Sequence, residues 1–555
     1  MGRILVTGAT GTVGRHAVAL LRQEGAEVVA LSSGTGDLRD PGSLPLDGVG
    51  AVLLVWPFAT AEGAREVVAA IAGQARRVVY LSSAARRDHE REIERLIEAS
   101  AREWTFLRPH AFAANALRWA RQVRAGVVRG AYGAAAMPPV HERDVAAVAV
   151  RALLDEGHHG AALHLTGPET ITQADQVRTI SEVTGIPARW EELPPERARA
   201  GLPAEGLPAG VVDEVLRAQA GLVTEPAPVT STVEEVTKVP ASTFREWVAE
   251  HAGAFRDVPP APPTMRAARI HAFGDASQIR EEEVDTPRPG PGEVLVEVAA
   301  TSFNPAEVGL RSGLLPEVFG TDLPRTLGWD VSGTVVETGA GVTGLARGDR
   351  VFGVVSGAAA GYVVAAADLL ARAPRSIPLA DAAAVPVAGL TAWQAIHEHA
   401  RITPGHRVLI NGAGGGIGLF AVRLVKLIGA HVTATASPRS ADAVRRLGAD
   451  VLVDYTAEPL PRDMDVLLNL AAIPGDTAAE LAGLAPAAVT VATPIEGATH
   501  FVTRDDPEQL AHLATLIDEG GLVVEVAESH PLSELPEIHR RAEAGDTRGK
   551  ITIHP

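Results

Sequence analysis

Residues 408–418 read Val-Leu-Ile-Asn-Gly-Ala-Gly-Gly-Gly-Ile-Gly, and an amphipathic pattern typical of a helix continues from Leu419 to Ala430. The apolar, β-branched start of this stretch predicts a strand that ends in a glycine-rich turn. Glycines recur at positions 412, 415 and 418. This spacing permits a tight turn, close approach of the backbone to a pyrophosphate and close packing of the helix on its strand. The positive end of the helix would face the phosphates, so the stretch predicts a dinucleotide site.

The same construction occurs near the start of the chain. Residues 3–14 read Arg-Ile-Leu-Val-Thr-Gly-Ala-Thr-Gly-Thr-Val-Gly, and a helix is predicted from Arg15 to about Gln23. Two strand–turn–helix motifs this far apart imply two dinucleotide-binding domains. The residues expected to bind cofactor in the two turns are Gly8, Thr10, Gly11, Thr12, Val13, Gly14, Gly412, Gly415, Gly416, Ile417 and Gly418.

Composition excludes several classes of function. The 555 residues are 46% hydrophobic and carry a net charge of −18, with lysine only at positions 238, 426 and 550. An acidic, lysine-poor surface argues against nucleic acid and anionic membranes as partners. The absence of cysteine excludes disulfides, thiolate catalysis and cysteine-ligated zinc. The first strand begins at residue 3 and no uncharged apolar run is long enough to span a membrane, so we expect a soluble cytoplasmic protein.

The pattern of the first half predicts a parallel sheet. Glu27–Leu31, Ala51–Val55 and Arg77–Leu81 read as strands, with helical stretches between them. Such alternation is typical of a doubly wound α/β fold. Where an NAD enzyme places an acid after the second strand, this chain has Ser32 and Ser33, and no arginine follows them directly. We expect both serines to border the cofactor, with a weak preference for NADP(H).

Seven segments of the first half form a recognisable set: 7–15, 36–38, 79–83, 103–109, 143–146, 165–169 and 244–247. Examples are Val-Tyr-Leu-Ser-Ser at 79–83 and Glu-Trp-Thr-Phe-Leu-Arg-Pro at 103–109. Together they resemble the NmrA-like, atypical short-chain dehydrogenase/reductase family. The resemblance covers about residues 1–255 and implies a Rossmann domain over 1–257, whose part from 131 to 255 covers the substrate.

The first half lacks the usual catalytic pair of short-chain reductases, a tyrosine with a lysine four residues later. Tyr80 and Tyr132 are followed at that distance by Ala84 and Ala136. The NmrA-like fold serves both reductases and nucleotide-sensing regulators, so both roles stay open for this half.

Ser82 and Ser83 match strand-end serines of the same family. In one interpretation they contact the nicotinamide or the substrate, and Ser82 is then catalytic and cofactor-binding. In the other they cap the turn after the strand. Asp144 is interpreted as the N-cap of a helix rather than as a catalyst.

Four prolines in Asp257–Thr264 predict a stiff linker over residues 258–264. Short strands separated by glycine turns follow it, and the parallel α/β pattern begins near Ala388. Motifs occur in order at 302–305, 328–333, 348–353, 388–393, 447–450 and 549–551. They resemble the zinc-independent medium-chain dehydrogenases/reductases of the quinone oxidoreductase group. That resemblance spans 265–555 and implies a GroES-like domain over 265–387, completed by about 520–555, around a nucleotide-binding domain over 388–519.

The predicted fold class is therefore α/β, with two Rossmann-type doubly wound parallel sheets and a β-rich GroES-like domain added to the second. No metal is expected. The chain has no cysteine, and His397 and His399 point apart on a predicted helix.

The second resemblance also implies site residues. Asn304 and Thr391 would border the nicotinamide as catalytic and cofactor-binding residues, and Asn469 would belong to the same nucleotide site. Ser437, Arg439 and Tyr455 would border the adenosine phosphate. The strand before Ser437 ends without an acid, and the Arg439 guanidinium suits a 2′-phosphate, so NADPH is favoured. Alternatively, Arg439 only caps the turn or faces solvent.

The leading hypothesis is a fused reductase with two modules and one NADP(H) in each. The second module would reduce a quinone or the C=C bond of an α,β-unsaturated carbonyl, and the first a neighbouring carbonyl. In a rival hypothesis, only the second module is catalytic and the first senses nucleotide or positions substrate. General quinone detoxification is a third hypothesis. The partners expected are a small carbonyl, enone or quinone substrate and a second copy of the chain. The proton donor is not identified.

Overall fold

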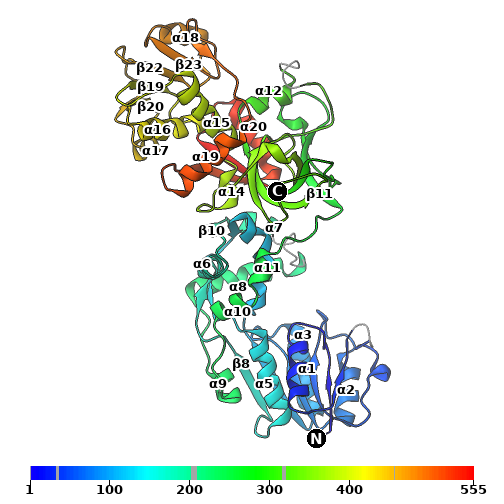
Figure 1. The fold of residues 1–555 in the computed structure, drawn as a ribbon. Coiled ribbons are helices and arrows are strands. Elements are labelled where there is room, and N and C mark those ends of the chain that lie inside the picture. The colour runs from blue at the N-terminus through cyan, green and yellow to red at the C-terminus, as the bar shows by residue number, and fades with distance from the viewer. Residues whose placement is uncertain (1, 33–36, 202–208, 315–319, 456) are drawn as a thin grey trace. The chain divides into compact units, whose positions relative to one another are not determined.

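The computed structural model describes residues 2–32, 37–201, 209–314, 320–455 and 457–555. The chain separates into two compact units. The first comprises Met1–Arg121, Val128–Gly185 and Arg189–Phe255, and the second comprises Gln122–Val127, Ile186–Ala188 and Arg256–Pro555. Each unit has its own six-stranded parallel sheet (Figure 1). No helix within the described ranges is both long and apolar enough to cross a membrane.

The sheet of the first unit has the order β2-β1-β3-β4-β5-β8, with every neighbouring pair parallel. Its strands are β1 (Arg3–Val6), β2 (Val28–Ala30), β3 (Val49–Val55), β4 (Arg77–Leu81), β5 (Glu103–Pro109) and β8 (Ala161–Leu165). The strands predicted at 27–31, 51–55 and 77–81 are confirmed. The chain leaves β1 for β2 on one side and then returns to β3 on the other. Ligands bind doubly wound sheets at such a reversal, beyond the carboxyl end of the strands.

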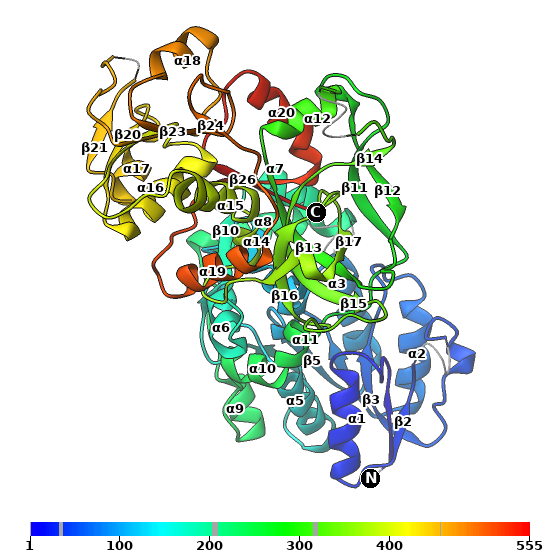
Figure 2. The same ribbon diagram turned by 45° about the horizontal axis from the view of Figure 1, so that its top comes forward.

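Helices cover both faces of this sheet (Figure 2). One face packs on α1 (Gly14–Gln23) and α5 (Glu142–Leu154), and the other on α2 (Ala64–Gln74) and α3 (Asp88–Ser100). Side chains along β3 alternate between the two cores, because Leu53 packs with the first pair of helices and Val52 and Leu54 pack with the second.

Further elements lie between α3 and the linker. They are α4 (Ala120–Ala125), β6 (Val127–Gly130), β7 (Ala136–Met137), β9 (Ile171–Thr172), α6 (Gln173–Thr184), β10 (Arg189–Glu192), α7 (Pro195–Gly201), α8 (Val212–Thr224), α9 (Thr232–Thr237), α10 (Phe244–Glu250) and α11 (Ala252–Arg256).

The β-rich part of the second unit contains two sheets. A three-stranded sheet is formed by β11 (Thr264–Ile270), β12 (Ile279–Asp285) and β14 (Arg325–Thr326). A seven-stranded sheet is formed by β13 (Glu293–Phe303), β15 (Asp330–Thr338), β16 (Arg350–Val354), β17 (Tyr362–Ala366), β18 (Leu370–Arg372), β25 (Val526–Pro531) and β26 (Lys550–His554). Strand β26 pairs antiparallel with β13, so the last strand of the chain lies beside a strand formed some 250 residues earlier.

The parallel sheet of the second unit has the order β21-β20-β19-β22-β23-β24. Its strands are β19 (Arg407–Asn411), β20 (His431–Thr435), β21 (Val451–Val453), β22 (Val466–Asn469), β23 (Ala487–Thr490) and β24 (Thr499–His500). The order again reverses at the first strand, β19. The crevice expected there lies at the glycine-rich turn that follows Asn411.

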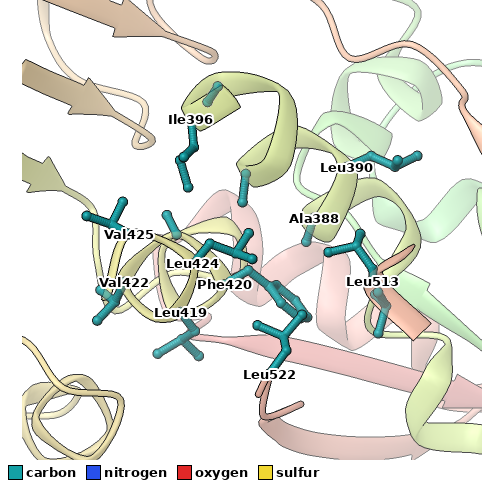
Figure 3. Close-up of a cluster of buried hydrophobic side chains, with 14 of the residues drawn as sticks. Ala388, Leu390, Ile396, Leu419, Phe420, Val422, Leu424, Val425, Leu513 and Leu522 are labelled. Atoms are coloured by element: carbon teal, nitrogen blue, oxygen red, sulfur yellow. The ribbon is translucent and has the colours of Figure 1, made fainter. Parts of the chain in front are cut away.

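The core beside this sheet joins three helices: α15 (Pro386–Gln394), α16 (Gly416–Ile428) and α19 (Pro507–Asp518). In Figure 3, Phe420 and Leu424 of α16 lie among Ala388, Leu513 and Leu522. Smaller helices are α12 (Ala306–Ser312), α14 (Leu379–Ala382), α17 (Ala441–Arg446), α18 (Gly475–Leu481) and α20 (Leu535–Glu543). The predicted fold class, two doubly wound parallel sheets with a β-rich part added to the second, is confirmed.

Candidate functional site

The turn between β1 and α1 is tight at its three glycines. Gly8 has a φ of +60°, and a Cβ atom on Gly14 would lie 2.1 Å from the Gly8 carbonyl oxygen. The N–H of Gly11 donates to the same oxygen at 2.9 Å. The Gly8 carbonyl group therefore explains the spacing of the three glycines, because both Gly11 and Gly14 lie close to its oxygen.

The outer side of this turn is open. Thr10, Gly11 and Thr12 are exposed, whereas Val13 is buried in the core and can offer a ligand only its backbone. Among the described residues no side chain caps the start of α1. The positive end of the helix dipole at this turn would stabilise an anion.

A cavity of about 340 Å³ lies beyond β3, lined by Arg39, Pro57, Phe58, Ala59, Thr60 and Glu62. The guanidinium carbon of Arg39 lies 4.0 Å from the centroid of the Phe58 ring. Val55, which ends β3, accepts from Thr7 Oγ1 at 2.9 Å and donates to it at 2.7 Å, so the end of β3 is held beside the residue that precedes Gly8. Sequence reasoning missed Arg39 because it considered only the residues directly after β2. Ser32 is partly buried there, and Ser33 lies outside the described residues.

Ser82 lies at the end of β4, where its hydroxyl donates to Glu94 Oε1 at 2.8 Å. Arg108 donates to both oxygens of the same carboxylate at 3.0 and 2.9 Å, and Arg86 donates at 3.0 Å. Burial acts to raise the pKa of Glu94, but the hydrogen bonds from Arg108, Ser82 and Arg86 outweigh it and lower that pKa. Glu94 is therefore ionised, and the Ser82 hydroxyl uses its proton in the hydrogen bond to this carboxylate.

Ser83 has a similar environment. Its hydroxyl donates to Glu90 at 2.7 Å and accepts the N–H of Arg86 at 3.2 Å, as a turn-capping serine does. Tyr80 is 1% exposed inside the sheet, and burial together with Glu90 and Glu94 raises its pKa. A buried phenol with a raised pKa is a poor acid–base group near neutral pH.

The interpretation of Asp144 as a helix N-cap is wrong. Helix α5 is capped by His141, whose Nδ1 accepts the N–H of Arg143 at 3.1 Å. Asp144 lies in the first turn of the helix. Its carboxylate accepts two hydrogen bonds from Ser242, one from the N–H at 2.7 Å and one from the hydroxyl at 3.1 Å. Asp144 thus anchors a distant loop instead.

The second glycine turn repeats the geometry of the first. Gly412 has a φ of +85°, and a Cβ atom on Gly418 would lie 2.2 Å from the Gly412 carbonyl oxygen. Gly415 is exposed at the N-cap of α16 and, as a glycine, offers no capping side chain. Ile417 is partly buried against the core. Both turns therefore fit the pyrophosphate of a dinucleotide. In each turn, glycines leave space that the side chain of another residue would fill, and no side chain caps the start of the helix that follows.

A row of polar side chains crosses four neighbouring strands behind this turn. Thr435 donates to Asn411 Oδ1 at 2.9 Å, and Asn411 Nδ2 donates to Asn469 Oδ1 at 2.8 Å. Asn469 Nδ2 donates in turn to Thr490 at 3.2 Å. Asn469 is fully buried, so it supports the turn from behind.

The turn of residues 437–440 packs on the glycine turn, since a Cβ atom on Gly414 would lie 2.2 Å from Ser440 Oγ. Ser437 is partly buried and Tyr455 is 57% exposed. Arg439 is exposed to solvent, where its guanidinium pairs with the exposed Asp546 at 3.0 Å. A phosphate at this position would compete with Asp546 for the guanidinium.

Asn304 lies after β13 in a buried polar cluster. Its Nδ2 donates to Asp330 Oδ2 at 2.8 Å and its Oδ1 accepts from Lys550 Nζ at 3.0 Å. Asp330 also accepts from the hydroxyl of Ser302. Sequence reasoning missed Asp330 and Lys550 as site residues, although both lie in the motifs that were recognised.

Thr391 is connected to the same cluster through α15. The other oxygen of Asp330 accepts the N–H of Val387 at 2.7 Å, at the start of this helix. Thr391 lies one turn later, where its hydroxyl donates to the Val387 carbonyl at 2.6 Å and lies 2.6 Å from the hydroxyl of Thr503. One buried carboxylate therefore positions Asn304 and the helix that carries Thr391.

The part of the chain that the structure describes contains no group of three or more metal-ligating side chains. His397 and His399 contact different rings, Trp393 and Phe501, at centroid distances of 4.0 and 4.1 Å.

Three family models match the chain. Residues 290–375 match the alcohol dehydrogenase GroES-like domain, 439–553 the zinc-binding dehydrogenase family, and 4–45 the NAD dependent epimerase/dehydratase family.

Individual relatives match about half of the chain. The (4-alkanoyl-5-oxo-2,5-dihydrofuran-3-yl)methyl phosphate reductase of Streptomyces griseus is 40% identical over 282 residues, which cover 45% of this chain and 99% of that protein. The chloroplast envelope quinone oxidoreductase homolog of Arabidopsis thaliana is 30% identical over 324 residues, 52% of this chain and 98% of that protein. The solved structure of the quinone oxidoreductase from Coxiella burnetii is 29% identical, with a TM-score of 0.50 over 53% of this chain and 99% of its own.

A short-chain type Rossmann module thus precedes a complete counterpart of these reductases, and the chain belongs through its second half to the quinone oxidoreductase group of the medium-chain dehydrogenases/reductases.

Proposed function

We propose that the second half, from about residue 265, is an NADPH-dependent, zinc-independent reductase that transfers hydride to a C=C bond conjugated to a carbonyl, or to a quinone. The observation that carries this proposal is the single carboxylate of Asp330, which holds both Asn304 and the helix of Thr391. Relatives support the acceptor class. The substrate named for the Streptomyces protein has a ring double bond next to carbonyl groups, and the Arabidopsis protein is named a quinone oxidoreductase homolog.

The residues of this half would act mainly by binding and orienting. The start of α16 stabilises the pyrophosphate, and Asn304 and Thr391 border the nicotinamide. When bound, the reduced nicotinamide supplies the hydride. The Thr391 hydroxyl donates to the Val387 carbonyl, so Thr503 is the donor in the contact between the two hydroxyls, and their oxygens can accept a hydrogen bond from a polar group of the cofactor or acceptor.

For the first half we propose nucleotide binding, with the cavity of Arg39 and Phe58 taking the adenosine end of NADP(H). Reduction of a carbonyl by this half is the alternative. The commitment of Ser82 to Glu94 and the burial of Tyr80 favour a binding role, because neither hydroxyl is free to handle a proton. General quinone detoxification would instead predict that the second half accepts many quinones with similar efficiency.

Calorimetric titration of the whole chain with NADPH, and with NADH for comparison, tests these proposals. Gly11→Asp and Gly415→Asp each place a carboxylate beside a glycine turn, where a Cβ atom would be 3.1 and 3.3 Å from a carbonyl oxygen. We expect two NADPH per chain in the wild type and one in each variant, because the carboxylate repels the phosphates. NADPH oxidation with enones or quinones should be lost only in Gly415→Asp.

Matched controls are Gly73→Asp and Gly475→Asp, where a Cβ atom would meet nothing within 4 Å. They should bind two NADPH. One NADPH in the wild type, abolished by Gly415→Asp, would leave the first turn without a nucleotide. Loss of NADPH oxidation in Gly11→Asp, with binding by the second half retained, would make the first half a catalyst.

A further inference from the structure

Lys550 differs from the other lysines of this chain in being buried. It is one of three lysines, and the other two are accessible to solvent: Lys238 is exposed, and Lys426 pairs with Asp450. Lys550 is 3% exposed and begins the last strand, β26. A buried ammonium is costly unless it is paired and hydrogen-bonded, so its partners indicate why it is there.

The partners of Lys550 determine the orientation of the Asn304 amide. A lysine ammonium can only donate and an ionised carboxylate can only accept. Lys550 Nζ lies 3.0 Å from Asn304 Oδ1, and Asp330 Oδ2 lies 2.8 Å from Asn304 Nδ2. Because a flipped amide would set donor against donor and acceptor against acceptor, Lys550 and Asp330 together allow one orientation only. The ammonium also lies 3.4 Å from Asp330 Oδ2.

The stem of Lys550 lies against the second glycine turn. A Cβ atom on Gly416 would be 2.7 Å from Lys550 Cδ and 3.3 Å from the carbonyl oxygen of Gly549. Gly415 and Gly549 are also joined as a β-bridge. Gly416 therefore makes room for the lysine. The same side chain thus contacts the start of α16 at its stem and Asn304 at its tip.

We propose that Lys550 is a positioning residue for hydride transfer: it fixes the amide of Asn304 and ties its position to the turn that holds the cofactor. This inference rests on the proposed reductase function. The buried ammonium acts through Asn304. Removing it would leave cofactor binding by the turn intact, but Asn304 would hold the nicotinamide at a less favourable distance from the acceptor.

Lys550→Met keeps the volume and removes the donor, and Lys550→Arg keeps a charged donor. With NADPH and an enone acceptor, we expect Lys550→Met to lower kcat about 10- to 100-fold, the scale of a misplaced reacting group, while the KM for NADPH changes little. The isotope effect on kcat with NADPH deuterated at C4 should rise, because hydride transfer becomes slower relative to the other steps. Lys550→Arg should recover part of kcat.

Lys426→Met is the control, since it removes a lysine of the same unit that pairs with Asp450 far along the chain from Asn304. The kcat and isotope effect of Lys426→Met should match those of the wild type.

If Lys550 has a purely structural role, Lys550→Met should reduce the amount of active enzyme and leave the isotope effect and the KM unchanged. That result would overturn the proposal. If Lys550→Met does not fold because the buried Asp330 carboxylate is left without the positive charge of the ammonium, the double variant Asp330→Asn/Lys550→Met removes both charges and should show the same raised isotope effect. An unchanged isotope effect in the double variant would also overturn the proposal for Lys550. A wild-type chain that oxidises no NADPH with any enone or quinone would overturn the proposed function and this inference together.

Discussion

A Cβ atom on Gly14 would lie 2.1 Å from the carbonyl oxygen of Gly8, the oxygen that also accepts the N–H of Gly11. The oxygen cannot move aside without breaking the turn. We therefore expect Gly14→Ala to destabilise the first unit by about 1–3 kcal/mol, as overpacking does, and to abolish NADPH binding there. Thermal unfolding and calorimetric titration measure the two effects. Gly73→Ala, in an open position on α2, should be neutral or slightly stabilising. Equal unfolding temperatures for Gly14→Ala and the wild type would refute the steric explanation.

Ser82→Ala distinguishes the two interpretations of the strand-end serine. Because the hydroxyl donates to the buried Glu94 carboxylate, we expect its loss to cost about 1.5–3 kcal/mol of stability, as for a hydrogen bond to a charged group. The kcat for NADPH oxidation should not change. Ser100→Ala removes a hydroxyl that bonds only to the Leu96 carbonyl on an exposed helix, and it should have a much smaller effect. A fall in kcat at unchanged stability would instead assign Ser82 to the chemistry.

Arg439 and Asp546 should affect cofactor preference in opposite directions. Asp546→Ala releases the guanidinium from its partner, so we expect tighter NADPH binding with little change for NADH. Arg439→Ala should weaken NADPH binding selectively. The ratio of the two dissociation constants, measured by titration, checks both. Asp442→Ala breaks the neighbouring pair with Arg445 and should leave the ratio unchanged. If all three variants share one ratio, Arg439 has no role in phosphate binding.

Glu307 should make stability depend on pH. Burial raises its pKa to about 7, opposed by backbone hydrogen bonds from Asn304 and Gly328 and aided by Asp330, against an ordinary value of 4.5. Between those values the folded chain holds a proton that the unfolded chain has released. Stability from this group is therefore present below pH 4.5, declines as the pH rises and is fully lost above about pH 7.

We expect Glu307→Gln to remove this decline. Its unfolding temperature, compared with that of the wild type, should improve between pH 4.5 and about pH 7 and then level off. Glu234→Gln, at an exposed position on α9, should follow the wild type at every pH. A constant difference between Glu307→Gln and the wild type would mean that Glu307 is already ionised at the lower pH.

The two glycine turns could be predicted because their cause is local: each depends on three glycines and the strand and helix beside them. The polar cluster around Asn304 could not be predicted from the sequence. Its partner Lys550 is 246 residues away, and only the pairing of β26 with β13 brings the two together. Asp144 was misassigned for a related reason, because its partner Ser242 lies 98 residues later. Arg39 was overlooked because only the residues directly after the second strand were considered.

The pairing of β26 with β13 also has a consequence for the order in which the protein is made. Asn304 leaves the ribosome long before Lys550, so β13 must wait for the last strand while the parallel sheet between them is synthesised. Parallel sheets form slowly, because each strand pairing closes a long stretch of chain. During synthesis the edge of β13 that β26 will occupy is unpaired, and unpaired edges favour aggregation. Slow translation of β26 would therefore prolong a stage at which this edge of β13 is open to aggregation.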